Sequence, residues 1–315
     1  MTVIDLFKKR SNQNANVKQG TITNRDNLVK LLENDIFGSM PIEKIKMSDA
    51  KEWIIRMRGK GYAYSSLKNH KRSLSAAFHM AVEDDYIRKN PFHFEIEDLI
   101  EDDTVPTAPL SKEQEKIFLD FIQQEEMYQQ YYDDIFVFLG TGLRSSEFCG
   151  LTLKDLDFEN RLIDVNHQLL GNLKSGFYIT SPKTKSSIRQ IPMSEPIYLT
   201  LKRVVAKPRP KPFEVDGYSD FVFYNDEGVP RNGKLYRSAL KRIMEKCNEV
   251  NEIQLPNISP HVLRHTFCTK MANMGMNPKA LQYIMGHKKI TMTLDYYAHA
   301  TCASAKEEMD RLISC

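Results

Sequence analysis

The sequence predicts a mainly α-helical protein of two domains, with a small antiparallel β-sheet in the second. Its 315 residues correspond to about two domains at roughly 100–200 residues each. Apolar residues recur at helical spacing through most of the chain, and short strand-like segments occur between residues 161 and 192. An acidic, proline-containing stretch at 96–110 separates the helical first part from the rest and predicts an exposed linker.

The first 95 residues are predicted to form a small helical domain. The first twenty are polar and are expected to be loosely ordered. Leucines on one face predict a helix over 23–35, and Ser48 is the expected N-cap of a second helix that ends at Gly59. Ser65 opens a third helix, which Asn90-Pro91 stops because a proline disfavours the helical conformation of the residue before it.

The second domain is predicted to be mostly helical. Ser111 opens its first helix, and the glutamates of the first turn suit the helix dipole. An apolar segment follows at 134–139. Further along the chain we expect strands at 161–166, 176–181 and 187–192, a loop at 204–217, and helices at 232–248, 260–274, 278–285 and 292–298.

Composition excludes several classes of protein. Hydrophobic residues make up 41% and charged residues 27%, which rules out a wholly disordered chain. No apolar run approaches the roughly 18 residues of a membrane span, and the N-terminus lacks the apolar region of a secretory signal. Five scattered cysteines without a C-x-x-C argue against a disulfide framework or zinc ribbon and suit a cytoplasmic location.

The net charge of +3 hides an uneven distribution. Residues 1–82 carry 15 basic and 7 acidic side chains (+8), residues 83–134 carry 4 and 16 (−12), and residues 135–315 carry 25 and 18 (+7). Polyanion binding needs local positive surface rather than a high total. On the third helix Lys68, Lys71 and Arg72 lie off the apolar face and are candidate phosphate contacts. From charge alone, an ordinary solvated surface is the slightly favoured interpretation.

Two segments of the second half place an arginine at a helix start. TGLRSSE at 141–147 puts Arg144 where a guanidinium and helix amides both suit a phosphate. In PHVLRH at 260–265, His261 and Arg264 share one face of a helix. Zinc binding by His261 and His265 competes with an anion site, but Val262 replaces the glutamate of H-E-x-x-H. Taken alone, each segment has an ordinary structural explanation.

Two further segments carry histidine and tyrosine. Gly286 ends a helix, so His287 lies in the turn beyond it. DYYAH at 295–299 carries the adjacent tyrosines Tyr296 and Tyr297. A tyrosine hydroxyl is a poor nucleophile near neutral pH because its reference pKa is about 10, so it needs cationic neighbours or a base. Alone, a turn histidine and a tyrosine pair are more often packing residues.

Together, the order and spacing of the four segments resemble the tyrosine recombinases, or phage integrase family. The family motifs T-G-x-R-x-x-E, H-x-x-R, G-H and Tyr-small-His match TGLRSSE, HVLR, GH and YAH. Residues 21–91 also resemble the family's core-binding domain, and MANMGMNPKALQYIMGHKKITMTLDYYAHA most resembles integrases of conjugative transposons. The resemblance implies a core-binding domain at 1–95, a linker at 96–110 and a catalytic domain at 111–315. Many such integrases carry a further N-terminal arm-binding domain; none is recognised in this sequence, so either the protein is short or this chain begins at its core-binding domain.

The resemblance also implies a catalytic set, with Glu147 supporting the first arginine. Tyr297 is the expected nucleophile because it directly precedes Ala298-His299, whereas Tyr296 does not. A hairpin lysine is Lys183 or Lys185, with Lys183-Thr184 the closer match. The implied catalytic residues are Arg144, Lys183, His261, Arg264, His287 and Tyr297.

In the implied mechanism the tyrosine attacks a DNA phosphate and forms a 3′-phosphotyrosine. The two arginines suit the charge that develops on the non-bridging oxygens. His261 acts as general base or acid, and Lys183 protonates the leaving 5′-oxygen. No metal, ATP or other cofactor is implied, because the arginines supply positive charge and the ester retains the bond energy. The expected activity is site-specific recombination that integrates and excises DNA.

The resemblance leaves alternatives and partners open. An Xer-like resolvase, a type IB topoisomerase and a non-catalytic DNA-binding protein share the scaffold or the chemistry. The implied partners are double-stranded DNA, three further copies in a tetramer, and an excisionase or host DNA-bending protein. Past Tyr297, an apolar stripe on a short helix packs either in its own domain or on a neighbour. It comprises Ala305, Met309, Leu312 and Ile313.

Overall fold

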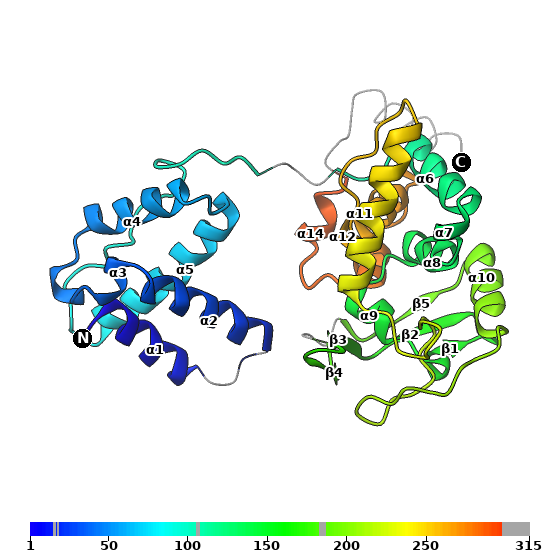
Figure 1. The fold of residues 1–315 in the computed structure, drawn as a ribbon, viewed down its shortest axis with the longest axis horizontal. Coiled ribbons are helices and arrows are strands. Elements are labelled where there is room, and N and C mark those ends of the chain that lie inside the picture. Colours follow the sequence, from blue (N-terminus) through cyan, green and yellow to red (C-terminus); the bar gives the residue numbers. More distant parts are fainter. Residues whose placement is uncertain (15–16, 18, 105–107, 183–186, 298–315) are drawn as a thin grey trace. The chain divides into compact units, whose positions relative to one another are not determined.

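The computed structural model describes residues 1–14, 17, 19–104, 108–182 and 187–297. The chain divides into two compact units, Met1–Pro106 and Thr107–Cys315 (Figure 1). The first unit is helical, and the second combines helices with two small antiparallel sheets, so the predicted fold class is confirmed. No helix among the described residues is long and apolar enough to cross a membrane.

The first unit packs its helices around one aromatic cluster. Trp53 stacks on Phe37 with ring centroids 5.3 Å apart, and Phe92 lies edge-on to both. These rings are fully buried, so they supply much of the apolar area that stabilises this unit. Its elements are α1 (Val3–Gln13), α2 (Gln19–Glu33), α3 (Ile36–Ser39), the 3-10 helix η1 (Ile42–Lys44), α4 (Met47–Gly59) and α5 (Tyr64–Glu83).

The expectation of a loosely ordered start is wrong for the described N-terminal residues. Thr2 and Asp5 form a capping box, in which each side chain accepts a hydrogen bond from the other's backbone amide. Val3, Leu6 and Phe7 are buried against the unit's core. The apolar positions recur at helical spacing within a polar segment, and average composition conceals that pattern.

In the second unit, three strands form one sheet in the order β1-β2-β5, and β3 pairs with β4 in a separate hairpin. Ile163 lies opposite Ile191, and Val165 lies opposite Arg189. The strands are β1 (Leu156–Asp157), β2 (Leu162–Val165), β3 (Gln168–Asn172), β4 (Gly176–Thr180) and β5 (Arg189–Pro192). The three predicted strands correspond to β2, β4 and β5, while β1 and β3 were not predicted.

The other regular elements of the second unit are helices. They are α6 (Lys112–Gln124), α7 (Glu126–Gln129), α8 (Tyr132–Thr141), α9 (Ser145–Gly150), η2 (Leu153–Asp155), α10 (Glu195–Val205), α11 (Gly233–Val250), α12 (Pro260–Asn273), α13 (Pro278–Met285) and α14 (Thr291–Leu294). Helix α10 was not predicted, although Ile197, Leu201 and Val204 form its buried face. The core of the unit centres on Phe148, which stacks between Phe138 and Phe223.

The predicted linker contributes to both cores. Ile96 is buried in the first unit. Leu110 is buried in the second, where its amide donates to Thr266 Oγ1 at 2.9 Å. Residues 101–104 between them are exposed. The two ends of the predicted linker are therefore packed rather than exposed.

Phe37 provides a test of the first core, because the chain's single tryptophan reports on it. We predict that Phe37→Ala lowers the free energy of unfolding of the first unit by about 3–5 kcal/mol, since it removes the ring that stacks on Trp53. Denaturant titration followed by tryptophan fluorescence measures this change. Ile36→Ala is the matched control, because Ile36 is 73% exposed and its loss should cost less than about 0.5 kcal/mol. If the two variants lost the same free energy of unfolding, Phe37 would not be a core residue of the first unit.

Candidate active site

The predicted arginines meet at the C-terminal end of α13. This helix ends at Gly286, whose φ of +59° is left-handed. The amides of Gly286 and His287 donate back to the carbonyls of Tyr283 and Gln282 at 3.0 and 3.1 Å. Such a glycine-ended turn satisfies only two of the helix's final carbonyls. The carbonyls of the next three residues therefore need other donors.

Three arginines satisfy those three consecutive carbonyls. Arg189 Nε donates to Ile284 O at 2.6 Å, Arg264 Nη2 donates to Met285 O, and Arg144 Nη2 donates to Gly286 O at 2.9 Å. The arginines come from β5, α12 and the N-cap of α9. Cations are favoured at a helix C-terminus because its unsatisfied carbonyls carry partial negative charge. The end of α13 thus gathers three elements that are distant in sequence.

Glu147 joins two of these arginines. Its Oε1 accepts from Arg144 Nη1 at 2.7 Å, and its Oε2 accepts from the Arg144 amide at 3.0 Å and from Arg189 Nη2 at 3.0 Å. Burial opposes ionisation of Glu147, but Arg189 and Arg144 outweigh it and hold its pKa below the usual value. Its carboxylate is therefore ionised near neutral pH and fixes Arg144 through both the backbone and the side chain.

Sequence reasoning missed Arg189. Its side chain is fully buried, and it shares the inward face of β5 with Ile191. The sequence did contain a signal for it. Arg189 lies two residues before the apolar Ile191 in a predicted strand, and residues two apart in a strand point to the same face of the sheet. Arg189 Nη1 also donates to Ser187 O at 2.9 Å, so every nitrogen of its guanidinium has a partner.

Gly286 is required for this close approach. A Cβ at Gly286 would lie 3.1 Å from Arg189 Nη1 and 3.3 Å from Arg144 Nη1, in addition to the strain of its positive φ. The glycine therefore ends the helix and also leaves room for two guanidinium groups.

The charges here favour an anion. Three arginines and one glutamate give a formal net charge of +2. Burial and then the charge of Arg144 lower the pKa of Arg264 to about 9, which still leaves the guanidinium charged near neutral pH. Arg264 Nη1 donates to Gly142 O at 2.6 Å, so the group is held on both sides. Fixed, incompletely compensated guanidinium groups suit a phosphate.

Two histidines lie in the same positive field and are neutral near pH 7. Burial, followed by Arg264 and Arg144, lowers the pKa of His287 to about 4. The same causes lower the pKa of His261. His287 Nδ1 is hydrogen-bonded to the buried Thr293 hydroxyl at 2.9 Å. If that hydroxyl donates, Nε2 of His287 carries the ring hydrogen and can donate to a phosphate oxygen. Neutral His261 can accept a proton.

The two tyrosines occupy different places. The ring of Tyr296 lies 4.7 Å from that of His265 and 6.3 Å from that of His287. The Tyr297 hydroxyl donates to Met276 O, which precedes the N-terminus of α13. A helix of eight residues is about 12 Å long, so this hydroxyl lies at the end of α13 opposite the arginines. Burial raises the pKa of Tyr297, which also keeps it protonated.

The remaining predicted residues are dispersed. Lys183 and Lys185 lie outside the described residues, as does the predicted apolar stripe after Tyr297. Lys68 donates to Glu97 at 2.7 Å, and Lys71 lies over the ring of Phe94. Arg72 instead lines a hollow in the first unit. The three predicted phosphate contacts of α5 thus have different surroundings.

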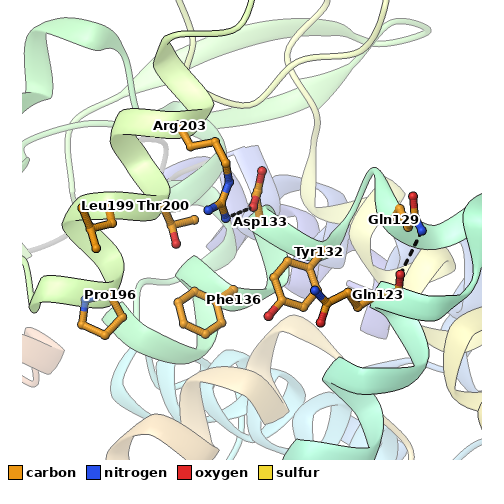
Figure 2. Close-up of a pocket in the computed structure, with 9 residues that line it drawn as sticks. All are labelled: Gln123, Gln129, Tyr132, Asp133, Phe136, Pro196, Leu199, Thr200 and Arg203. Atoms are coloured by element: carbon orange, nitrogen blue, oxygen red, sulfur yellow. Dashed lines mark hydrogen bonds and ion pairs between the residues drawn. The ribbon is translucent and has the colours of Figure 1, made fainter.

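A hollow of about 680 Å³ in the second unit does not coincide with the arginine cluster. Arg203 of α10 reaches Asp133 of α8 across it, and Tyr132, Phe136 and Leu199 supply apolar surface (Figure 2). None of its lining residues belongs to the predicted catalytic set. Nor do the described residues include a cluster of three His, Cys, Asp or Glu side chains that could hold a metal ion.

Comparison with known proteins identifies close relatives. The sequence matches the model of the phage integrase family over residues 109–303. It is 52% identical over 313 residues to the transposase from transposon Tn916 of Enterococcus faecalis, with 99% of this chain and 77% of that protein covered. The ICEBs1 integrase of Bacillus subtilis (strain 168) is 25% identical, with 89% and 73% covered.

Solved structures of two integrases have a fold similar to that of this chain. The Tn1549 transposon integrase in complex with a circular intermediate DNA superposes with a TM-score of 0.94 at 52% identity, and 99% of each chain is covered. Lambda integrase bound to a core site superposes with a TM-score of 0.65 over 94% of this chain and 95% of that one. At 17% identity this second likeness concerns the fold alone.

The resemblance that four short motifs indicated is thereby confirmed. The family model covers well over half of the chain, and the alignment with the Tn916 transposase covers nearly all of it. This chain belongs to the phage integrase family and is a tyrosine recombinase, an enzyme of DNA strand transfer.

Proposed function

We propose that this recombinase binds double-stranded DNA and integrates and excises a mobile element of the Tn916 kind, with the arginine cluster at the end of α13 as its phosphate site. One observation carries the proposal: Arg144 and Arg264 donate to adjacent carbonyls beside His287. A scissile phosphate placed there meets two fixed guanidinium groups and a neutral imidazole donor. Relatives of similar sequence support the choice of DNA, since the Tn1549 integrase was solved with a circular intermediate DNA.

The proposed reaction is an in-line transesterification. Tyr297 Oη forms a bond to phosphorus, its proton passes to His261, and the bond to the 5′-oxygen breaks. Arg144, Arg264 and His287 stabilise the charge on the non-bridging oxygens. Lys183, which lies outside the described residues, protonates the leaving 5′-oxygen. A 5′-hydroxyl from a second duplex then reverses the attack and rejoins the strands.

Cleavage requires the Tyr297 hydroxyl to leave Met276. A single hydrogen bond contributes about 0.5–1.5 kcal/mol net, so contacts made with DNA can offset its loss. The segment that carries Tyr297 is short: nine residues, 288–296, separate it from His287, and four of them form α14. A shift of this segment along α13 would bring the hydroxyl toward the arginines.

For the first unit, we propose that the hollow lined by Arg72 contacts DNA. Its volume is about 810 Å³, and its lining includes Arg10, Arg25 and Lys30 but no acidic residue. Burial and the nearby charge of Arg25 lower the pKa of Arg10, so positive charge is crowded here. By contrast, hydrogen bonds from Lys68 to Glu97 and Tyr64 raise the pKa of Lys68, and Glu97 already offsets its charge.

We also propose a tetramer on DNA. Strand exchange joins two duplexes that are each cut on both strands, so it needs four active sites. The apolar stripe at Ala305, Met309, Leu312 and Ile313 remains the candidate link between copies. An excisionase or a host DNA-bending protein would be an additional partner.

Covalent capture tests the proposed function. We expect the wild-type protein to select nicked duplexes from a random-sequence library as covalent adducts, because loss of the short fragment past the nick prevents rejoining. Adducts should also form in EDTA. Recovery of non-covalent complexes alone would indicate a DNA-binding protein without recombinase chemistry.

The nucleophile can be assigned with a matched pair of variants. We predict that Tyr297→Phe binds the selected duplex with unchanged affinity and forms no adduct, since only the attacking oxygen is removed. Tyr296→Phe should still form the adduct. Peptide mapping of the wild-type adduct gives the linked residue directly. The reverse pattern would move the nucleophile to Tyr296.

Glycine substitutions test the arginine cluster. We predict that Gly286→Ala reduces the adduct-forming rate by at least about tenfold, because its Cβ would displace Arg144 and Arg189. Gly176→Ala is the control, since Gly176 has a similar positive φ of +77° with open space around it. Both variants should lose about 1–2 kcal/mol of stability from backbone strain. Equal rates for the two would contradict the requirement for space at Gly286.

Salt titration tests the DNA surface of the first unit. We predict that Arg72→Gln weakens duplex binding and lowers the log–log salt slope by about 0.9, the value for one phosphate contact. Lys68→Gln should change the slope much less, because Glu97 already pairs with Lys68. Fluorescence anisotropy at several salt concentrations measures both slopes. A larger change for Lys68→Gln would place the DNA on the other side of α5.

A further inference from the structure

Arg189 is a fully buried cation that the reaction described above does not use. Its guanidinium donates to Ile284 O at 2.6 Å, to Ser187 O at 2.9 Å and to both oxygens of Glu147 at 3.0 and 3.3 Å. Its side chain has no exposed surface, so it cannot contact DNA itself. A buried ion pair is costly to build, because both charges lose their hydration. Its position at this site calls for a role beyond stability.

The balance of charge among Glu147, Arg144 and Arg189 indicates what this role is. Without Arg189, the carboxylate of Glu147 would be paired with Arg144 alone, and this pair would be neutral. With Arg189 present, the positive charge of one arginine remains uncompensated. Arg144 is the arginine of the two that reaches the surface, since its side chain is 35% exposed against 0% for Arg189. Arg189 therefore leaves the charge of Arg144 available to a phosphate, while Glu147 still holds Arg144 in place.

The contact with Ile284 adds a geometric role. Ile284 lies one residue before Met285 and two before Gly286, which accept from Arg264 and Arg144. Arg189 thus holds the last turn of α13 from β5, and His287 follows that turn directly. A change at Arg189 would therefore move Arg144, Arg264 and His287 relative to one another.

We propose that Arg189 is a positioning residue for DNA cleavage: it neutralises Glu147 so that Arg144 keeps its charge for the phosphate, and it holds the last turn of α13 that carries His287. This inference rests on the proposed function. It predicts an effect on the cleavage step rather than on DNA binding, because Arg189 never reaches the DNA.

The experiment compares three variants of the full chain on a captured, nicked duplex. Arg189→Met removes the charge, Arg189→Lys keeps the charge but loses the planar fork, and Glu147→Gln combined with Arg189→Met removes both charges. Single-turnover adduct formation at saturating DNA gives the cleavage rate, anisotropy gives the affinity, and circular dichroism gives the folded fraction. Arg161→Met is the control, since Arg161 pairs with Glu195 at an exposed position beside β2.

We expect Arg189→Met to cleave about a hundredfold more slowly, a loss comparable to that of one electrostatic stabiliser, with affinity within about threefold of wild type. The double variant should recover at least about tenfold over Arg189→Met, because the neutral amide that replaces the Glu147 carboxylate no longer cancels the charge of Arg144. Arg189→Lys should lose about tenfold. The control should match wild type.

A purely structural role predicts a different pattern. Rates would then follow the folded fraction, and the double variant, which loses one more charged partner, would be no faster than Arg189→Met. Either result overturns the inference. If Arg189→Met does not fold, Arg189→Lys carries the test, and a wild-type cleavage rate for it contradicts the geometric role. Absence of any adduct with the wild-type protein would instead reject the proposed function.

Discussion

The proposed active site depends on how one short helix ends. Helix α13 terminates in a glycine turn that satisfies the carbonyls of Gln282 and Tyr283 and leaves those of Ile284, Met285 and Gly286 for side-chain donors. A buried carbonyl without a donor is costly, so the turn requires donors from neighbouring elements. Arginines meet this requirement and bring charge with them. The arginines that satisfy these backbone carbonyls thereby bring β5, α9 and α12 together in one cationic site.

The gathering of three arginines at the end of α13 also explains why Glu147 is buried beside them. Three guanidinium groups cannot be packed together without a counterion, and Glu147 serves two of them at once. It compensates only one positive charge, so the cluster stays cationic. Burial lowers the pKa of His287 and of Arg264, and the positive charge of the neighbouring arginines lowers both further. A bound phosphate diester would offset the positive charge that Glu147 leaves uncompensated, and the greater negative charge of the transition state would offset more of it.

The sequence predicted the fold class and three members of the proposed site, because motifs record residue identities at fixed local spacing. Arg144, Arg264 and His287 were found in this way and do converge. Arg189 was missed because its importance lies in contacts with Glu147 and Ile284, 42 and 95 residues away. Helix α1 was missed because its polar composition outweighs three buried apolar positions. Where the Tyr297 hydroxyl rests could not be predicted, since it depends on a carbonyl in the loop before α13.

A crystal structure of Tyr297→Phe bound to its captured DNA would show whether the end of α13 builds the phosphate site. We expect one backbone phosphate to lie within hydrogen-bonding distance of Arg144, Arg264 and His287. The two arginines should keep their contacts with Gly286 O and Met285 O, and Arg189 should keep its contacts with Glu147 and Ile284. A scissile phosphate bound elsewhere, or arginines that release α13 to reach it, would show that the end of this helix does not build the site.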